Sequence, residues 1–169
     1  HIIQHAQIVL SETGYADVLT VRRTPHPHNM ALLGAARYLP AQNGTALCFD
    51  FGQTGVKRAS VTIKGQHITN ITPFPTLSVS WLWHNSPEAA CNINATEVCD
   101  FICETIIQTR TLCRTGDVNP KAQMVASVAA YVRGGQLLGN GLYARIMALG
   151  PDARQTLAKS IQRRSGEHI

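Results

Sequence analysis

Residues Ala46 to Leu77 read ALCFDFGQTGVKRASVTIKGQHITNITPFPTL, and this stretch decides the fold. Short runs rich in β-branched and aromatic residues alternate in it with Gly-containing turns, a pattern typical of strands in hairpins. The expected strands are 46–51, 56–64 and 67–74, with turns at 52–55 and 65–66. Three consecutive strands with such short connections predict an antiparallel meander, which Pro73 and Pro75 are expected to end.

The segments on either side of this meander add helices and further strands. Helices are expected at 5–13, 30–38, 95–112, 142–149 and 151–164, and strands at 17–22 and 123–132. The run from Gln123 to Val132 is almost wholly apolar, which is typical of a strand covered on both faces. The four glycines at 134, 135, 139 and 141 then predict a flexible loop. Strands mixed with covering helices predict an α/β fold built on a single layered sheet.

Length and charge limit the classes of protein to consider. The chain has 169 residues, with 15 Lys and Arg against 10 Asp and Glu, and 44% of it is apolar. At roughly 100–200 residues per domain, this length allows one domain or two very small ones, and the apolar fraction is enough for a core. The basic residues are scattered and no aromatic residues alternate with them, so a nucleic-acid partner is not favoured. The longest apolar run is far short of the ~20 residues that cross a bilayer, so no membrane partner is expected.

The first residue indicates how the chain is produced, and the cysteines indicate the cellular compartment of the protein. The chain begins with His1 rather than Met, so it is expected to be a processed or excised piece. Cys99 and Cys103 lie four positions apart on one face of an expected helix, and two such ligands could bind a metal ion. Since no further His or Cys pair of suitable spacing completes a zinc set, buried free thiols in a reducing compartment are favoured. The cytoplasm is the predicted location.

The segment that carries chemistry is Phe49-Asp50-Phe51-Gly52-Gln53-Thr54-Gly55-Val56-Lys57. It places a carboxylate at the end of a buried strand and a glycine-flanked turn directly after it. Gly52 and Gly55 can take positive φ and let backbone amides converge on an anion, while Thr54 and Lys57 add a hydroxyl and a positive charge. Asp50 could hold hydrated Mg²⁺ beside a phosphate. A plain hairpin whose Asp and Thr satisfy local amides fits the same spacing, and both interpretations stay open.

The run from Ala46 to Leu77 resembles the opening of the ROK family (repressor, open reading frame, kinase), which belongs to the actin-like ATPases. The first phosphate motif of that family is Asp-x-Gly-Gly-Thr, followed by a hairpin. Here Asp50, Gly52 and Thr54 match the motif, whereas Gln53 replaces the second glycine. Phe74-Pro75-Thr76 is similar to the Pro-Thr-Pro-like ending of the family's hairpin.

A second resemblance lies upstream. Residues 17–39, which contain VLTVRRTPHPHNMALLGAARYL, are similar to the C-terminal strand and helix of ROK proteins. In this chain they precede the phosphate motif, as in a circular permutation. The resemblance implies that residues 1–169 form a single ribonuclease-H-like, actin-type ATPase lobe. Residues 1–40 would correspond to the family's C-terminal tail and residues 46–169 to its N-terminal lobe.

The resemblance implies a function as well. ROK kinases transfer the γ-phosphoryl group of ATP to a sugar hydroxyl in the cleft between two lobes. ATP and Mg²⁺ are thus the implied cofactors, a sugar is the implied substrate, and Asp50 is the implied metal-orienting residue. The residues implied to hold the phosphates are Gly52, Gln53, Thr54, Gly55 and Lys57, and those implied to face the sugar are Arg133, Gly134 and Gly135.

The departures from the family pattern are as informative as the matches. The family's catalytic aspartate is expected on a strand just after Ile169, and the second phosphate motif, the adenosine-binding glycines and the zinc cluster are missing. Gln53 puts a side chain where the family brings backbone against phosphate. The catalytic residues are therefore unknown, and activity would need a second lobe or another copy of the chain. The alternative is a non-catalytic regulatory or binding module derived from such a lobe.

Overall fold

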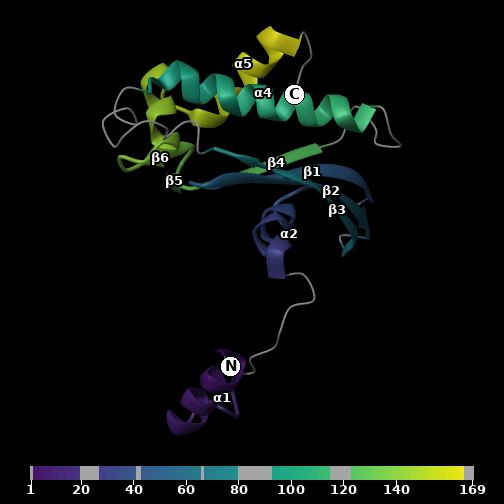
Figure 1. Ribbon diagram of the computed structural model, residues 1–169, viewed down its shortest axis with the longest axis vertical. Coiled ribbons are helices and arrows are strands. Elements are labelled where there is room, and N and C mark those ends of the chain that lie inside the picture. The colour runs from purple at the N-terminus through teal and green to yellow at the C-terminus, as the bar shows by residue number, and fades with distance from the viewer. Residues whose placement is uncertain are drawn as a thin grey trace. The chain divides into compact units, whose positions relative to one another are not determined.

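The computed structural model describes residues 2–19, 27–40, 43–65, 67–79, 93–114 and 123–165 (Figure 1). The chain divides into two compact units, His1–Met30 and Ala31–Ile169. The first holds helix α1 (Ile2–Glu12) and the 3-10 turn η1 (Pro27–Asn29), and helix α2 (Met30–Ala36) begins at the boundary. In the ranges described, no helix combines the length and the apolarity needed to cross a membrane. The single-lobe organisation of residues 1–169 stays a prediction.

The second unit is a mixed α/β structure. Its main sheet consists of β1 (Asn43–Phe51), β2 (Gly55–Lys64), β3 (His67–Ser78) and β4 (Gln123–Val128), and its remaining elements are α4 (Ala95–Arg114), β5 (Tyr131–Arg133), β6 (Gln136–Leu138), η3 (Tyr143–Leu149) and α5 (Ala153–Ser165). The strand order is β3-β2-β1-β4, and β5 pairs separately with β6. Strands β1, β2 and β3 are antiparallel neighbours, whereas β4 runs parallel to β1. The expected meander and the α/β class are confirmed.

The two faces of this sheet carry separate cores, because successive side chains of a strand point to opposite sides. On one face Leu47 and Phe51 of β1 pack in a cluster with α4, η3 and α5. On the other face Cys48 packs in a cluster with Leu32 and Ala36 of α2. Figure 1 shows α4 and α2 on opposite sides of the sheet. Helix α2 thus packs against β1.

Strand β3 is longer than expected. It continues through Pro73 and Pro75 to Ser78, so the expectation that these prolines end it is wrong. Strand β3 is the edge of the sheet, where a missing N–H on the outer side removes no ladder hydrogen bond. The register also shifts between Val56 and Arg58 on the neighbouring strand, and this irregularity accommodates Pro75.

The run 123–132 is not one strand. Strand β4 ends at Val128, where the Ala129 amide donates to the carbonyl of Phe51 at 2.9 Å, and the chain then turns into β5. The glycines that follow make an ordered hairpin turn, since Gly134 and Gly135 take φ of 55° and 82° between β5 and β6. The expected flexible loop is therefore wrong at these two positions.

Of the remaining elements, the helices around 95–112 and 151–164 occur as expected, but the start of the second helix differs and the expected strand at 17–22 is not observed in its described part. Residues 16–18 form a turn and residue 19 is in no regular element, so no strand begins here, and residues 20–22 lie outside the described ranges. Helix α4 begins with a reciprocal pair in which the Asn94 side chain accepts from the Glu97 amide and Glu97 accepts from the Asn94 amide. Asp152 caps α5 by accepting from the Gln155 amide at 2.9 Å, so this helix begins after the expected Pro151 start.

Candidate functional site

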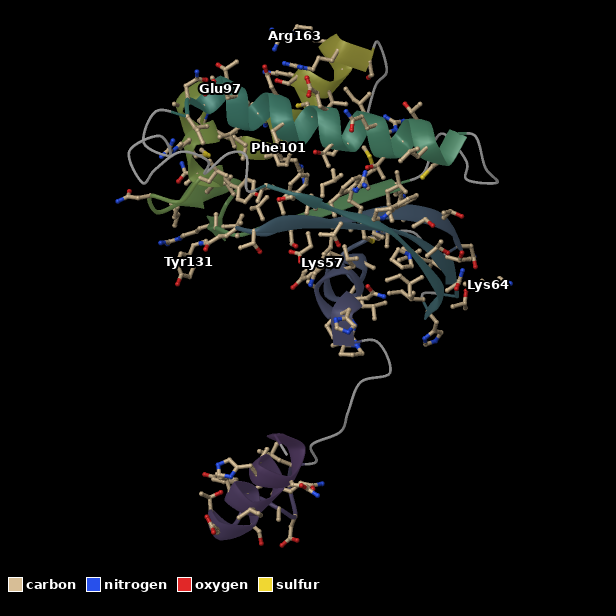
Figure 2. The ribbon with its side chains drawn as sticks, viewed as in Figure 1. Lys57, Lys64, Glu97, Phe101, Tyr131 and Arg163 are labelled. Carbon is tan, nitrogen blue, oxygen red and sulfur yellow. The ribbon has the colours of Figure 1, made fainter. Side chains whose placement is uncertain are left out.

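The end of β1 brings three polar side chains into one row across the sheet. Asp50 pairs in register with Lys57 on β2 and with Ser127 on β4, and residues at the same register point to the same face. The Ser127 hydroxyl donates to Asp50 Oδ1 at 2.9 Å. Asp50 is half-buried and Lys57 is exposed, and Figure 2 shows Lys57 on the side of the sheet that α2 covers. The carboxylate and the ammonium named from the sequence are thus neighbours.

The turn after Asp50 is tight, but not in the way the sequence suggested. The positive-φ glycines of the described ranges are Gly14, Gly44, Gly65, Gly134, Gly135 and Gly139. Gly52 and Gly55 are not among them, so the expected positive φ at these two positions is wrong. Instead, both positions need glycine because a side chain does not fit. A Cβ at Gly52 would lie 3.0 Å from the Gly55 carbonyl oxygen, and a Cβ at Gly55 would lie 3.1 Å from the Leu77 carbonyl oxygen.

This geometry also limits what the turn can offer an anion. The Gly52 amide donates to the Gly55 carbonyl at 3.0 Å and to the Asp50 carbonyl at 3.1 Å, so it is already satisfied within the turn. Gln53 and Thr54 are exposed at its tip. The Gln53 carboxamide and the Thr54 hydroxyl are therefore exposed side-chain donors of the turn, and the Lys57 ammonium is a further exposed donor on β2.

Tyr143 supports the turn from the opposite face of the sheet. Its hydroxyl, carried by η3, donates to the Gly52 carbonyl at 2.8 Å. Its ring is fully buried and packs edge-on against Phe51, with ring centroids 6.0 Å apart. Burial, and then the nearby Asp50 carboxylate, raise the pKa of Tyr143 to about 12. Tyr143 thus holds the turn in place as a neutral hydrogen-bond donor.

Sequence reasoning missed both Ser127 and Tyr143. Ser127 interrupts the apolar run of β4, and a hydroxyl in the middle of such a strand is the signal that could have marked it. Tyr143 carries no comparable signal, because a tyrosine in a short amphipathic segment is an ordinary core residue.

Arg133, Gly134 and Gly135 belong to the β5–β6 hairpin. Arg133 and Gly134 are exposed, whereas Gly135 packs on the start of α5. Its carbonyl accepts from the Ala153 amide at 3.0 Å, and a Cβ there would lie 2.4 Å from an oxygen of Asp152. Within the described ranges, no hydrogen bond or ion pair joins these three residues to the turn after Asp50.

The metal-binding capacity of the site is that of a single carboxylate. No group of three or more His, Cys, Asp or Glu side chains that could hold a metal ion occurs in the part of the chain that the structure describes. Mg²⁺ keeps several waters and is commonly bound by one or two carboxylates together with substrate phosphates. Asp50, with one oxygen engaged by Ser127, fits that mode and does not fit an all-protein metal cage.

A pocket of about 480 Å³ lies elsewhere, between α4 and α5. Its lining residues are Thr96, Cys99, Asp100, Leu149, Gly150, Pro151, Asp152, Gln155, Thr156, Lys159, Ser160 and Arg163. None of them belongs to the turn after Asp50. The pocket and the turn are therefore separate features of the molecule.

Replacing Tyr143 by Phe should change the alkaline stability of the protein. The phenol ionises at its ordinary pKa of 10.0 in the unfolded chain but at about 12 in the folded one, so the unfolded state loses its proton first. The free energy of unfolding should therefore fall between pH 10 and 12, with a contribution from Tyr143 of at most about 1.4 kcal/mol per pH unit. Tyr143→Phe should lose that part of the slope in urea unfolding curves.

The buried thiol of Cys48 serves as an internal reference for this pH dependence. Burial raises the pKa of Cys48 to about 12, and its contribution persists in Tyr143→Phe. At neutral pH the variant should lose roughly 1 kcal/mol, because the Gly52 carbonyl loses its donor. Identical profiles for the two proteins above pH 10 would mean that Tyr143 is not buried as a neutral phenol.

No protein family, no curated protein and no solved structure matches the chain. Its function is therefore inferred from its own residues and from the resemblance in its sequence.

Proposed function

We propose that this chain is a lobe of a ROK-like sugar kinase, which binds Mg-ATP at the turn after Asp50 and contributes to phosphoryl transfer to a sugar hydroxyl. The observation that carries the proposal is the placement of Asp50. Its half-buried carboxylate lies at the carboxyl end of a strand with a parallel neighbour, is oriented by Ser127 and is followed by a tight glycine-flanked turn. Ligands of α/β sheets bind at such strand ends.

The sheet topology supports the finer fold assignment in this proposal. A ribonuclease-H-like, actin-type lobe would have an antiparallel meander, a helix and then a strand parallel to the first one. The order β3-β2-β1-β4, with α4 between β3 and β4 in the chain, agrees with that arrangement. The packing of Leu32 and Ala36 against the face of the sheet opposite α4 agrees with a permuted C-terminal helix.

Each residue of the turn has a proposed role. Asp50 would orient hydrated Mg²⁺, which supplies charge neutralisation of the phosphates when bound. Thr54 and Lys57 would contact phosphate oxygens, because both are exposed beside the carboxylate. Gly52 and Gly55 would keep the turn tight, and Gln53 would border the nucleotide.

The sugar side of the proposal rests on Arg133 and the two glycines after it. The exposed guanidinium of Arg133 could donate to sugar or phosphate oxygens, while Gly134 and Gly135 fix the hairpin that presents it. A second lobe or another copy of the chain would supply the missing catalytic base. Four buried free cysteines, Cys48, Cys99, Cys103 and Cys113, support a reducing compartment such as the cytoplasm.

Two features of the turn favour a second candidate function, a non-catalytic binding or regulatory module. The Gly52 amide is satisfied within the turn, and Gln53 brings a side chain to its tip. Both features reduce the backbone donors that a phosphate could meet. A lobe that kept its fold and lost tight nucleotide binding would have these properties.

Calorimetric titration with Mg-ATP separates the two functions. The wild-type chain should bind Mg-ATP, and Asp50→Ala should bind it roughly tenfold more weakly or worse, since the metal loses its protein carboxylate. Asp17→Ala, which removes an exposed carboxylate from the first unit, is the matched control and should bind as the wild type does. Absence of binding by a folded wild-type chain would overturn the kinase proposal and favour the regulatory module.

A further inference from the structure

Two buried thiols lie side by side on the face of α4 that meets α5. Cys99 Sγ and Cys103 Sγ are 3.9 Å apart, and the two residues are 2% and 0% exposed. The Cys99 thiol also donates to the hydroxyl of Ser160 on α5 at 3.5 Å. No disulfide joins the two sulfurs, so both cysteines are present as thiols.

The pocket between α4 and α5 reaches Cys99, one of the two thiols. Its volume is about 480 Å³, and Cys99 and Ser160 are among the residues that line it. The polar residues Thr96, Asp100 and Thr156 also line it, so it can admit solvent and small hydrated species. Cys99 is buried, but solvent in the pocket can therefore approach its thiol from one side.

We propose that Cys99 and Cys103 form a two-thiolate site for a soft monovalent metal ion, Cu(I) in particular, which enters through the pocket between α4 and α5. Thiolate sulfur selects soft ions such as Cu(I), which do not need the four ligands of a structural zinc site. At a metal–sulfur distance of about 2.3 Å, two sulfurs 3.9 Å apart can both reach one ion, which they flank at an angle of roughly 115°. A solvent molecule would complete the coordination of the ion.

Binding of the metal ion at this site changes the number of protons and the net charge. Each thiol releases its proton to solvent on binding, so two thiolates and Cu(I) form a complex with one net negative charge. Arg164 lies at the edge of the same helix pair, where it forms ion pairs with Asp100 and Glu104.

The test is Cu(I) binding by the reduced full-length chain without oxygen, in competition with the chromophoric chelator bicinchoninate. The wild type should take up one equivalent, and Cys99→Ala and Cys103→Ala should each bind at least tenfold more weakly. Cys48→Ala and Cys113→Ala remove buried thiols from other places in the fold and should bind as the wild type does. Cys91→Ala should also bind normally, and circular dichroism shows whether each variant is folded.

A measurement on the wild type covers the case in which a core variant does not fold. In mild urea, bound Cu(I) should slow alkylation of Cys99 and Cys103 by iodoacetamide about tenfold more than that of Cys48. The proposal is overturned if the folded wild type takes no Cu(I) from the competitor. It is also overturned if uptake survives in Cys99→Ala and Cys103→Ala, or if protection is equal at all three cysteines.

Discussion

Phe51→Ala is expected to lower the free energy of unfolding by about 3–5 kcal/mol, the cost of emptying a fully buried aromatic position. Phe51 is 0% exposed and lies at the centre of an aromatic group. Its ring stacks with Phe49 at 6.0 Å between centroids and meets Phe101 and Tyr143 edge-on at 6.3 and 6.0 Å. These contacts join β1 to α4 and η3, so a cavity here loosens the face of the sheet that supports the turn.

Urea unfolding followed by circular dichroism measures this loss. Since domains of this size have only about 5–15 kcal/mol of stability, this loss is a large fraction of the total and should shift the unfolding midpoint clearly to lower urea. Phe74→Ala, at a partly buried position on the edge strand, is the matched control and should cost clearly less. Equal losses at the two positions would contradict the assignment of Phe51 to the centre of the core.

Arg58→Ala is the second substitution with a large expected effect. Arg58 is 4% exposed, and its guanidinium donates to the Thr109 hydroxyl at 2.9 Å and to the Pro75 carbonyl at 2.8 Å. It also lies over the ring of Phe74, 5.9 Å from the ring centroid. In the ranges that the structure describes, no carboxylate forms an ion pair with it. Burial lowers the pKa of this guanidinium, as expected of a charge without a counterion.

The absence of a counterion predicts different results for two replacements. Arg58→Ala should cost about 2–4 kcal/mol, because it leaves a cavity and an unpaired Pro75 carbonyl. Arg58→Met fills much of the same volume and removes a buried charge, so it should stay within about 1–2 kcal/mol of the wild type. The difference between the two variants in urea unfolding is the measurement. If Met is as costly as Ala, the polar contacts of Arg58 outweigh its desolvation.

The meander could be predicted from the sequence because its information is local. Strands β1 and β2 are joined by the turn after Asp50, and the alternation along each strand shows which side chains face the core. The expected strand 67–74 was too short because proline usually ends a strand. An edge strand tolerates Pro73 and Pro75, but nothing within the segment itself shows that it lies at the edge. Likewise, the break after Val128 depends on a hydrogen bond from Ala129 to another strand.

The residues of the candidate site also divide into those that local sequence predicts and those that depend on tertiary packing. Asp50, the turn after it and Lys57 are neighbours in sequence and could be named from it. Ser127 lies 77 positions after Asp50 and Tyr143 lies 91 positions after Gly52, so their contacts depend on how β4 and η3 pack. The positive φ expected at Gly52 was wrong because glycine is needed there for space rather than for its backbone angles.

The most direct test of the proposed nucleotide site is paramagnetic broadening by Mn-ATP in the amide NMR spectrum of the chain. Mn²⁺ takes the same oxygen ligands as Mg²⁺ and broadens nearby signals. The proposal predicts that broadening is greatest at the amides of Gln53, Thr54 and Ser127, and that it disappears in Asp50→Ala. Broadening centred on the pocket between α4 and α5, or none in the folded wild type, would contradict it.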